Sequence, residues 1–203
     1  MNVALIGATG NIGSKVLAEL ASRGHSVTAV SRNPEKTAAG PNVQAAKGDA
    51  DDVAAMSALM KGHDAVVSSL PFAPGCSAKL IEAVKRSGVK RYVMVGGAGS
   101  LEVAPGKMLK DTLALPDPIR KILDEAAASL QRLRGEPELE WTFFSPAAEI
   151  GLGARTGKFR LGGDRLVTDA DGKSRISYDD YAIALVDELE HPQHIRNRFT
   201  AAY

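Results

Sequence analysis

A glycine-rich turn lies almost at the start of the chain, in the stretch ALIGATGNIGSKV. Gly7, Gly10 and Gly13 are three residues apart; a short apolar run at 3–6 precedes them, and apolar residues at helical spacing follow over 11–23. Glycine allows a tight turn and a close approach of the backbone to a pyrophosphate, and the start of a helix offers free amides and a positive dipole end. This strand–turn–helix context predicts a dinucleotide-binding turn rather than a plain glycine turn.

Strand-like and helix-like stretches then alternate along most of the chain. We expect strands at 3–6, 26–31, 43–47, 65–70, 91–97 and 141–145, and helices at 11–23, 51–60, 77–87, 117–134 and 178–190. This alternation predicts an α/β fold: a doubly wound parallel sheet with helices on both faces, forming one Rossmann domain over residues 1–203. Gly-Gly and Asp-Gly turns in residues 155–177 predict short strands in a small C-terminal region on the substrate side. We expect the substrate pocket to form from the loops after strands four, five and six, together with residues 151–177.

Two helix starts carry recognisable capping patterns. The helix at 117–134 is expected to begin with Asp117 as the N-cap and Pro118 in its first turn. Its apolar stripe is predicted to consist of Ile119, Ile122, Leu123, Ala126, Leu130 and Leu133. Ser177 and Asp180 are expected to form a capping pair at the start of the last helix.

The end of the second predicted strand indicates which dinucleotide is bound. NAD-binding proteins usually place an acid there for the ribose 2′-hydroxyl, but this chain reads Ser31-Arg32-Asn33. The planar guanidinium of Arg32 can pair with a 2′-phosphate, so NADP(H) is preferred and NAD(H) is the second choice; a solvated surface arginine is the alternative interpretation. Asp49, beside Ala50, either accepts from the adenine amino group or starts the following helix.

Charge and composition argue against several classes of partner. A net charge of +1 gives no electrostatic reason to expect nucleic acid or an anionic membrane. Cys76 is the single cysteine and the first residues do not resemble a signal peptide, so we expect a cytoplasmic protein. His191 and His194 are expected to lie in a solvated C-terminal loop without carboxylate or thiol ligands, so no metal site is predicted. Both a monomer and a dimer are compatible with the sequence.

Several motifs together resemble a known family. The GxxGxxG spacing, Ser31-Arg32, Gly48-Asp49 and the SSLP stretch resemble the atypical short-chain dehydrogenase/reductases. The stretches VGGAGSL, EWTFFSPAAEI, RTGKFRLGGD and ISYDDYAIALVDELEHP resemble more closely the group named NADH-flavin reductases. That group is related to flavin reductase/biliverdin-IX-beta reductase and to NmrA-like NAD(P)H-binding proteins. The resemblance covers essentially the whole chain, and only its NADH label disagrees with Arg32.

The resemblance implies where the nicotinamide end of the cofactor lies. The segment after the fourth strand would pass the nicotinamide ribose, the end of the fifth would lie near the ring, and the turn at 145–147 would line the other side. The residues expected to contact the cofactor are Gly7, Thr9, Gly10, Asn11, Ile12, Gly13, Ser31, Arg32, Asn33, Asp49, Ala50, Ser69, Leu70, Pro71, Gly96, Gly97 and Ala98.

Classical members of this superfamily protonate their product with a Tyr-x-x-x-Lys pair, which this chain lacks. Ser100 lies just beyond the place of a catalytic serine and is the one candidate catalytic residue, although a turn-forming serine is the favoured interpretation. A flavin, quinone or tetrapyrrole can take its proton from water, so hydride transfer needs little more than stacking. We therefore expect an NAD(P)H-dependent reductase of such an acceptor, with FMN or FAD as substrate rather than as bound cofactor. The alternative is a non-catalytic NADP(H)-binding redox sensor, and a nucleotide-sugar isomerase is disfavoured.

Two basic clusters are candidates for contacting an acidic substrate. One consists of Lys107 and Lys110, and the other of Arg155, Lys158 and Arg160. A solvated face is the alternative interpretation for both, and it is the favoured one.

Overall fold

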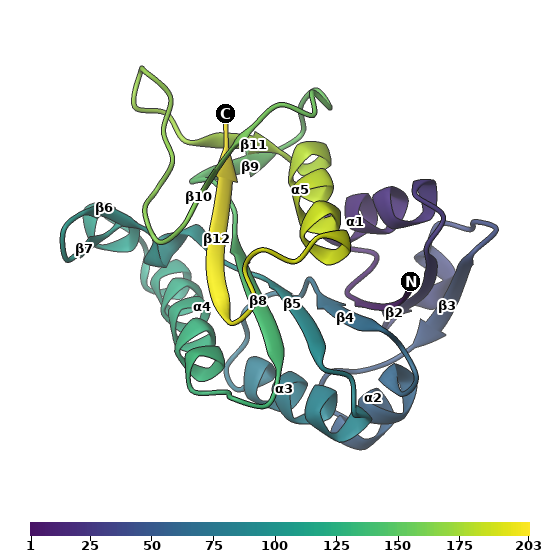
Figure 1. Cartoon of the computed structure of the whole chain (residues 1–203). Coiled ribbons are helices and arrows are strands. Elements are labelled where there is room, and N and C mark those ends of the chain that lie inside the picture. Colours follow the sequence, from purple (N-terminus) through teal and green to yellow (C-terminus); the bar gives the residue numbers. More distant parts are fainter.

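The computed structural model describes all residues, 1–203. One eight-stranded sheet runs through the molecule in the order β10-β12-β8-β5-β4-β1-β2-β3 (Figure 1). Its strands are β1 (Asn2–Ile6), β2 (Ser26–Ser31), β3 (Val43–Lys47), β4 (Ala65–Ser68), β5 (Arg91–Val95), β8 (Glu140–Ser145), β10 (Arg160–Gly162) and β12 (Asn197–Ala202). Seven strands are parallel, and only β10 runs antiparallel, against β12. The strands at the centre are mostly apolar because both faces of the sheet are covered.

Helices cover both faces of this sheet. One layer consists of α1 (Asn11–Ser22) and α5 (Tyr178–Glu190), and the other of α2 (Val53–Met60), α3 (Cys76–Ser87) and α4 (Asp117–Arg134). Figure 1 shows the two layers on opposite sides of the strands. Each layer packs an apolar cluster against the sheet: 24 buried residues on the side of α1 and α5, and 18 on the side of α2, α3 and α4. The predicted doubly wound α/β fold is confirmed.

The chain reverses its direction of travel across the sheet between β1 and β4. From β1 it passes through α1 to β2 on one side, whereas β4 pairs with β1 on the other side. In open parallel sheets, ligands bind beyond the carboxyl ends of the strands at such a switch point. The glycine-rich turn follows β1 directly, so the fold places it at that point.

Within the eight-stranded sheet, two strands end earlier than predicted and one strand, β12, was not predicted. β4 stops at Ser68 and β5 at Val95. The next amide of each still donates to a carbonyl of the neighbouring strand: Ser69 to Ile6 and Gly96 to Phe144. β12 was not predicted because its apolar residues are interrupted by Arg198 and Thr200, both of which find polar partners inside the protein. An alternating polar residue in a strand buried on both faces cannot be recognised by periodicity.

The segment between β5 and α4 is more regular than expected. It contains two 3-10 helices, η2 (Ala98–Ser100) and η3 (Leu109–Thr112), which flank a small antiparallel pair. That pair consists of β6 (Glu102–Ala104) and β7 (Lys107–Met108). Leu101 is fully buried at its centre, so the segment packs around its own apolar residue.

The start of α4 differs from the prediction. Pro116 occupies the N-cap position and Asp117 is already helical, so Asp117 does not cap the helix. Ile119 and Ile122 are 46% and 49% exposed and therefore do not belong to the buried stripe. The reason is that the first turns of α4 lie against η2 rather than the sheet, with Leu123 packed on Gly99. The buried stripe consists of Ala126, Leu130 and Leu133.

Only half of the predicted cap of α5 is present. The Ser177 hydroxyl accepts from the Asp180 amide at 3.0 Å, as expected. The Asp180 carboxylate does not return this bond, because the Tyr203 hydroxyl accepts from the Ser177 amide at 3.0 Å. Asp180 instead accepts from the loop at Thr156 and Gly157. The carboxylate therefore holds the C-terminal region rather than its own helix.

The expected short strands are present in residues 155–177 as β10 and β11 (Arg175–Ser177), but they do not pair with each other across the Gly-Gly and Asp-Gly turns. β11 instead pairs in parallel with β9 (Glu149–Gly151), a strand that was not predicted. None of the five helices is both long and apolar enough to pass through a bilayer.

Candidate cofactor site

The three glycines of the turn after β1 are required for different reasons. Gly7 has φ +83°, and a Cβ there would lie 2.2 Å from the Ser69 carbonyl oxygen. A Cβ on Gly13 would lie 2.1 Å from the Gly7 carbonyl oxygen, because α1 starts directly on the turn. Gly10 is different: it is exposed, its φ is −76°, and the nearest atom to an added Cβ is 3.5 Å away. The protein itself does not need a glycine at position 10, whereas a pyrophosphate lying there would.

The first amides of α1 are left free by the sequence. The N-cap residue is Gly10, which has no side chain to accept a hydrogen bond, and the first turn contains no acid. The amides of Asn11, Ile12 and Gly13 consequently have no acceptor within the protein. Free amides at the positive end of a helix dipole attract an anion. The turn therefore fits a phosphate group, with the exposed Thr9 beside it.

The end of β2 offers a hydroxyl and a cation without partners. The Ser31 side chain is buried and its Oγ has no hydrogen-bond partner. Arg32 and Asn33 follow on the surface, and neither side chain forms an ion pair or a hydrogen bond within the protein. Buried polar groups are rarely left unpaired unless a ligand or water completes them. Arg32 is thus an exposed, unpaired cation at the end of β2, whereas the Ser31 hydroxyl is closed off from solvent.

The structure decides one of the two interpretations of Asp49. Its carboxylate accepts from the Asp51 amide at 3.0 Å, whereas Asp52 caps α2 by accepting from the Ala55 amide at 3.0 Å. Asp49 therefore does not start the helix. It is exposed beside the half-buried Ala50, and its contact with adenine stays a prediction.

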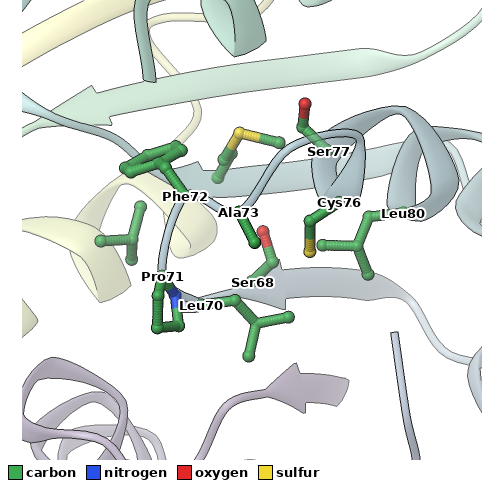
Figure 2. A pocket seen from close by; sticks show the side chains of 10 residues that line it. Ser68, Leu70, Pro71, Phe72, Ala73, Cys76, Ser77 and Leu80 are labelled. Carbon is green, nitrogen blue, oxygen red and sulfur yellow. The ribbon is translucent and has the colours of Figure 1, made fainter. Parts of the chain in front are cut away.

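The segment after β4 covers a small cavity rather than a binding pocket. Ser69, Leu70 and Pro71 lead from β4 toward α3, and a cavity of about 20 Å³ lies beneath them (Figure 2). Its lining includes Phe72 and Cys76, and ligand pockets are usually at least about 300 Å³. A larger hollow of about 530 Å³ lies at the opposite, amino-terminal edge of the strands. Neither is the expected acceptor site, which would lie above the carboxyl edge of the sheet.

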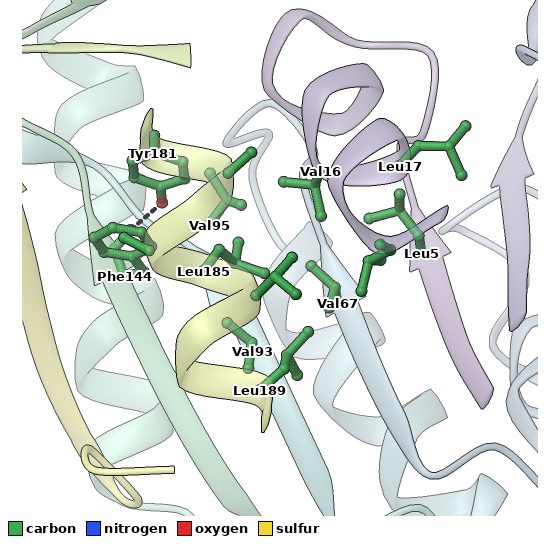
Figure 3. Packing of buried hydrophobic residues seen from close by; sticks show 14 of the residues in the cluster. Leu5, Val16, Leu17, Val67, Val93, Val95, Phe144, Tyr181, Leu185 and Leu189 are labelled. Atoms are coloured by element: carbon green, nitrogen blue, oxygen red, sulfur yellow. Dashed lines mark hydrogen bonds between the residues drawn. The ribbon is translucent and has the colours of Figure 1, made fainter. Parts of the chain in front are cut away.

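The end of β5 is shaped by aromatic packing. A Cβ on Gly96 would lie 2.3 Å from the Phe143 ring, and one on Gly97 would lie 3.0 Å from the Ala126 Cβ. The Phe144 carbonyl accepts both from the Gly96 amide at 2.7 Å and from the Tyr181 hydroxyl at 2.6 Å. Figure 3 shows the Tyr181 hydroxyl hydrogen-bonded to Phe144. The rings of these two residues stack with their centroids 3.9 Å apart. Packing alone explains both glycines, and their contact with nicotinamide, like that of Ala98, stays a prediction.

Three of the four tyrosines, Tyr92, Tyr181 and Tyr203, are hydrogen-bonded inside the protein. Burial raises the pKa of Tyr181 well above its usual value, although the nearby Gly96 amide opposes this. Burial likewise raises the pKa of Tyr92, whose hydroxyl lies 2.8 Å from the Ser68 Oγ. Tyr203 donates to Asp180. These phenols are held by structural partners rather than directed at an open site.

The candidate catalytic residue Ser100 is buried and already has a partner. Its hydroxyl accepts from the Arg198 guanidinium at 3.0 Å, and its carbonyl accepts from the same nitrogen at 3.0 Å. This contact is what a positioned turn residue would make. At the neighbouring end of β8, Ser145 is fully buried and its hydroxyl has no partner. Its lack of a partner cannot be recognised from sequence.

The two basic clusters do not converge on a site. Arg155 pairs with Glu19 at 2.8 Å, and Arg160 donates to the carbonyls of Thr168 and Tyr203. Lys110 pairs with Asp124. These three residues therefore have internal partners, and binding of an acidic substrate by either cluster stays untested. Lys107 and Lys158 are solvent-exposed.

No group of three or more His, Cys, Asp or Glu side chains lies close enough together to hold a metal ion. His194 contacts Glu188 at 2.8 Å, so the expectation that it has no carboxylate neighbour is wrong; His191 is exposed.

Comparison with known proteins decides the family. The family model described as NAD(P)H-binding matches residues 7–192, which is nearly the whole chain and includes the glycine-rich turn. The chain belongs to the NAD(P)H-binding family. This membership agrees with the expected atypical short-chain dehydrogenase/reductase relationship and with the free cradle at the start of α1.

Three solved structures are similar to this family member over their whole length. A candidate exported protein from Burkholderia pseudomallei is 46% identical, covers 100% of both chains and has a TM-score of 0.90. A candidate epimerase from Bacteroides thetaiotaomicron is 42% identical, with 100% and 96% coverage and a TM-score of 0.95. A candidate NADH-flavin reductase from Streptococcus pneumoniae is 33% identical, with 100% and 99% coverage and a TM-score of 0.84. The chain is thus an oxidoreductase-like NAD(P)H-binding protein whose relatives carry differing functional names.

Proposed function

We propose that this protein is an NADPH-dependent reductase of a flat conjugated acceptor, with a flavin such as FMN or FAD as the substrate. Bound NADPH would supply a hydride to the acceptor, which takes a proton from water while NADP⁺ leaves. The part of the chain is to bind the dinucleotide in the turn after β1 and to hold the acceptor against the nicotinamide. The observation that carries the proposal is the open position at Gly10 beside the free amides of α1.

The preference for NADPH rests on the end of β2. No carboxylate is present there to bind a ribose 2′-hydroxyl; the chain instead offers the unpaired Arg32 beside the unpartnered Ser31 hydroxyl. A guanidinium is a suitable donor for a phosphate, whereas an acid would repel it. This supports NADPH over the NADH named in the similar Streptococcus pneumoniae protein.

The preference for a conjugated acceptor rests on the missing Tyr-x-x-x-Lys pair. An alcohol dehydrogenase or an epimerase must move a proton at a defined atom, for which a positioned side chain is needed. Tyr92, Tyr181 and Tyr203 are bonded within the protein, and Ser100 is bonded to Arg198. A flavin, quinone or tetrapyrrole places no such demand on the protein. We extend the proposal to a cytoplasmic location, as the single cysteine suggests, although one relative is named as an exported protein.

Replacing Arg32 with alanine should change the cofactor preference selectively. We expect the KM for NADPH to rise about tenfold or more, because charge-assisted hydrogen bonds contribute about 1.5–3 kcal/mol. The KM for NADH should stay within about twofold. The measurement is steady-state oxidation of both cofactors with FMN.

Arg86→Ala is the matched control, since Arg86 is an exposed arginine on α3 that pairs only with Glu82. It should leave both KM values unchanged. Equal weakening of NADPH and NADH by Arg32→Ala would contradict the 2′-phosphate assignment. Tight NADPH binding without reduction of any flavin or quinone would contradict the reductase proposal and favour a redox sensor.

A further inference from the structure

We propose that Arg198 and Asp164 form a latch that positions η2, the turn that follows β5, for hydride transfer. This inference rests on the proposed function, because it takes the end of β5 as the nicotinamide side of the site. Arg198 lies on β12 and Asp164 in the loop after β10, so both come from the C-terminal third of the chain. They act on a turn that precedes them by more than sixty residues.

Arg198 is a buried guanidinium whose donors are fully used. Its side chain is 3% exposed. Nη1 donates to the carbonyl and to the hydroxyl of Ser100, both at 3.0 Å. Nε donates to Asp164 Oδ1 at 2.7 Å, while Nη2 donates to the Asp164 carbonyl at 3.2 Å and contacts the same carboxylate. An arginine has five N–H groups in a rigid planar arrangement, and here five contacts join two segments.

The backbone joins the same two segments. The Glu102 amide donates to the Asp164 carbonyl at 2.9 Å, and the Leu166 amide donates to the Glu102 carbonyl at 2.9 Å. Figure 1 shows the loop after β10 descending to the segment between β5 and α4. Arg134 of α4 adds an outer contact to Asp164 at 3.1 Å, with both side chains about half exposed. The latch therefore ties η2 to the loop that would form the opposite wall of the acceptor site.

Stability alone does not account for a charged group at this position. Burying a guanidinium is costly, and well-packed apolar residues often serve a fold equally well. What a fully bonded arginine adds is geometric definition in two directions at once. η2 begins directly after Gly97, so a displacement of η2 moves the end of β5 as well. Hydride transfer is sensitive to such displacements, since a shift of about 1 Å can cost about a hundredfold in rate.

The latch is tested with Arg198→Lys and Asp164→Asn in the full chain. Lysine keeps the charge but has a single donor nitrogen, so it cannot reproduce the planar set of contacts that the three nitrogens of Arg198 make to Ser100 and Asp164. We expect the kcat with FMN to fall about tenfold to a hundredfold, while the Kd for NADPH changes less than about twofold. We also expect faster hydrogen exchange in peptides covering 98–104 and 163–167, and unchanged exchange in 3–20, where the glycine turn lies.

Arg134→Ala is the control, because this substitution removes only the exposed contact between Arg134 and the Asp164 carboxylate. It should leave kcat and exchange close to the wild type. A fall in kcat without faster local exchange would overturn the proposal, and so would a global rise in exchange with weaker NADPH binding, which indicates a purely structural role. If the wild type shows no turnover, the proposed function fails. The hydrogen-exchange pattern alone then decides whether the latch holds η2. Unchanged exchange at 98–104 in both Arg198→Lys and Asp164→Asn overturns the latch.

Discussion

Replacing Gly10 with alanine should leave the protein folded and weaken NADP(H) binding at least about tenfold. The backbone at Gly10 is extended, and an added Cβ meets no protein atom closer than 3.5 Å, so the fold accepts the methyl group. The methyl group would instead occupy the space where the pyrophosphate approaches the turn. Calorimetric titration with NADPH measures the loss of affinity, and thermal unfolding of the unliganded protein checks the fold.

Gly13→Ala is the matched comparison within the same turn. A Cβ at Gly13 would lie 2.1 Å from the Gly7 carbonyl oxygen, a backbone atom that cannot move without shifting α1. We expect the free energy of unfolding to fall by about 3 kcal/mol, at the upper end for overpacked sites, and binding to be lost together with stability. A Gly10→Ala variant that binds NADPH as tightly as the wild type would place the cofactor elsewhere.

Replacing Asp180 with asparagine should destabilise the protein by about 2–4 kcal/mol at neutral pH. The carboxylate is fully buried and accepts from the Thr156 amide and hydroxyl, from the Gly157 amide and from the Tyr203 hydroxyl. Asparagine keeps the shape but presents one amide group to donors that need an acceptor. The loop at 151–159 and the C-terminus should loosen together. Chemical denaturation at neutral pH gives the loss.

The same carboxylate should make stability depend on pH. Burial tends to raise the pKa of Asp180, but the hydrogen bonds from Thr156, Gly157 and Tyr203 outweigh it and hold the pKa below its ordinary value of 3.8. Because the pKa is depressed in the folded state, the stabilisation is present above 3.8 and is lost as the pH falls through the folded-state pKa. Asp180→Asn should flatten this acid limb of the stability curve.

Asp179→Asn serves as the control, because the neighbouring Asp179 carboxylate makes a partly exposed pair with Lys15. Such pairs contribute about 0–1 kcal/mol, so this variant should keep nearly all the stability and the acid limb. If Asp180→Asn and Asp179→Asn behave alike, the role given to Asp180 is wrong.

The central part of the fold could be predicted because its signals are local. Most parallel strands from β1 to β8 contain a short apolar run, and the turns after β1 and at the end of α3 are marked by glycines. The packing at the start of α4 could not be predicted. Ile119 and Ile122 have the spacing of a buried helix face, but both are exposed. β12 was missed because Arg198 interrupts its apolar pattern.

The candidate site divides in the same way. The glycine-rich turn and the Ser31-Arg32 pair are each a continuous stretch of sequence, so the chemistry of each can be recognised from the sequence alone. The contact between Ser100 and Arg198 spans 98 residues, and nothing in the sequence around either residue indicates the other. The free hydroxyls of Ser31 and Ser145 could not be anticipated either, because a partner is missing only once the fold is known.

The most direct test of this account is a single-turnover reaction of the wild-type protein with NADPH and FMN without oxygen. The absorbances of the nicotinamide and of the flavin are followed together. We predict that one FMN is reduced for each NADPH oxidised, far faster than in the absence of protein, and more slowly when NADH replaces NADPH at the same concentration. NADPH that binds but stays unoxidised, with the flavin unchanged, would contradict the account and leave a protein that only senses the dinucleotide.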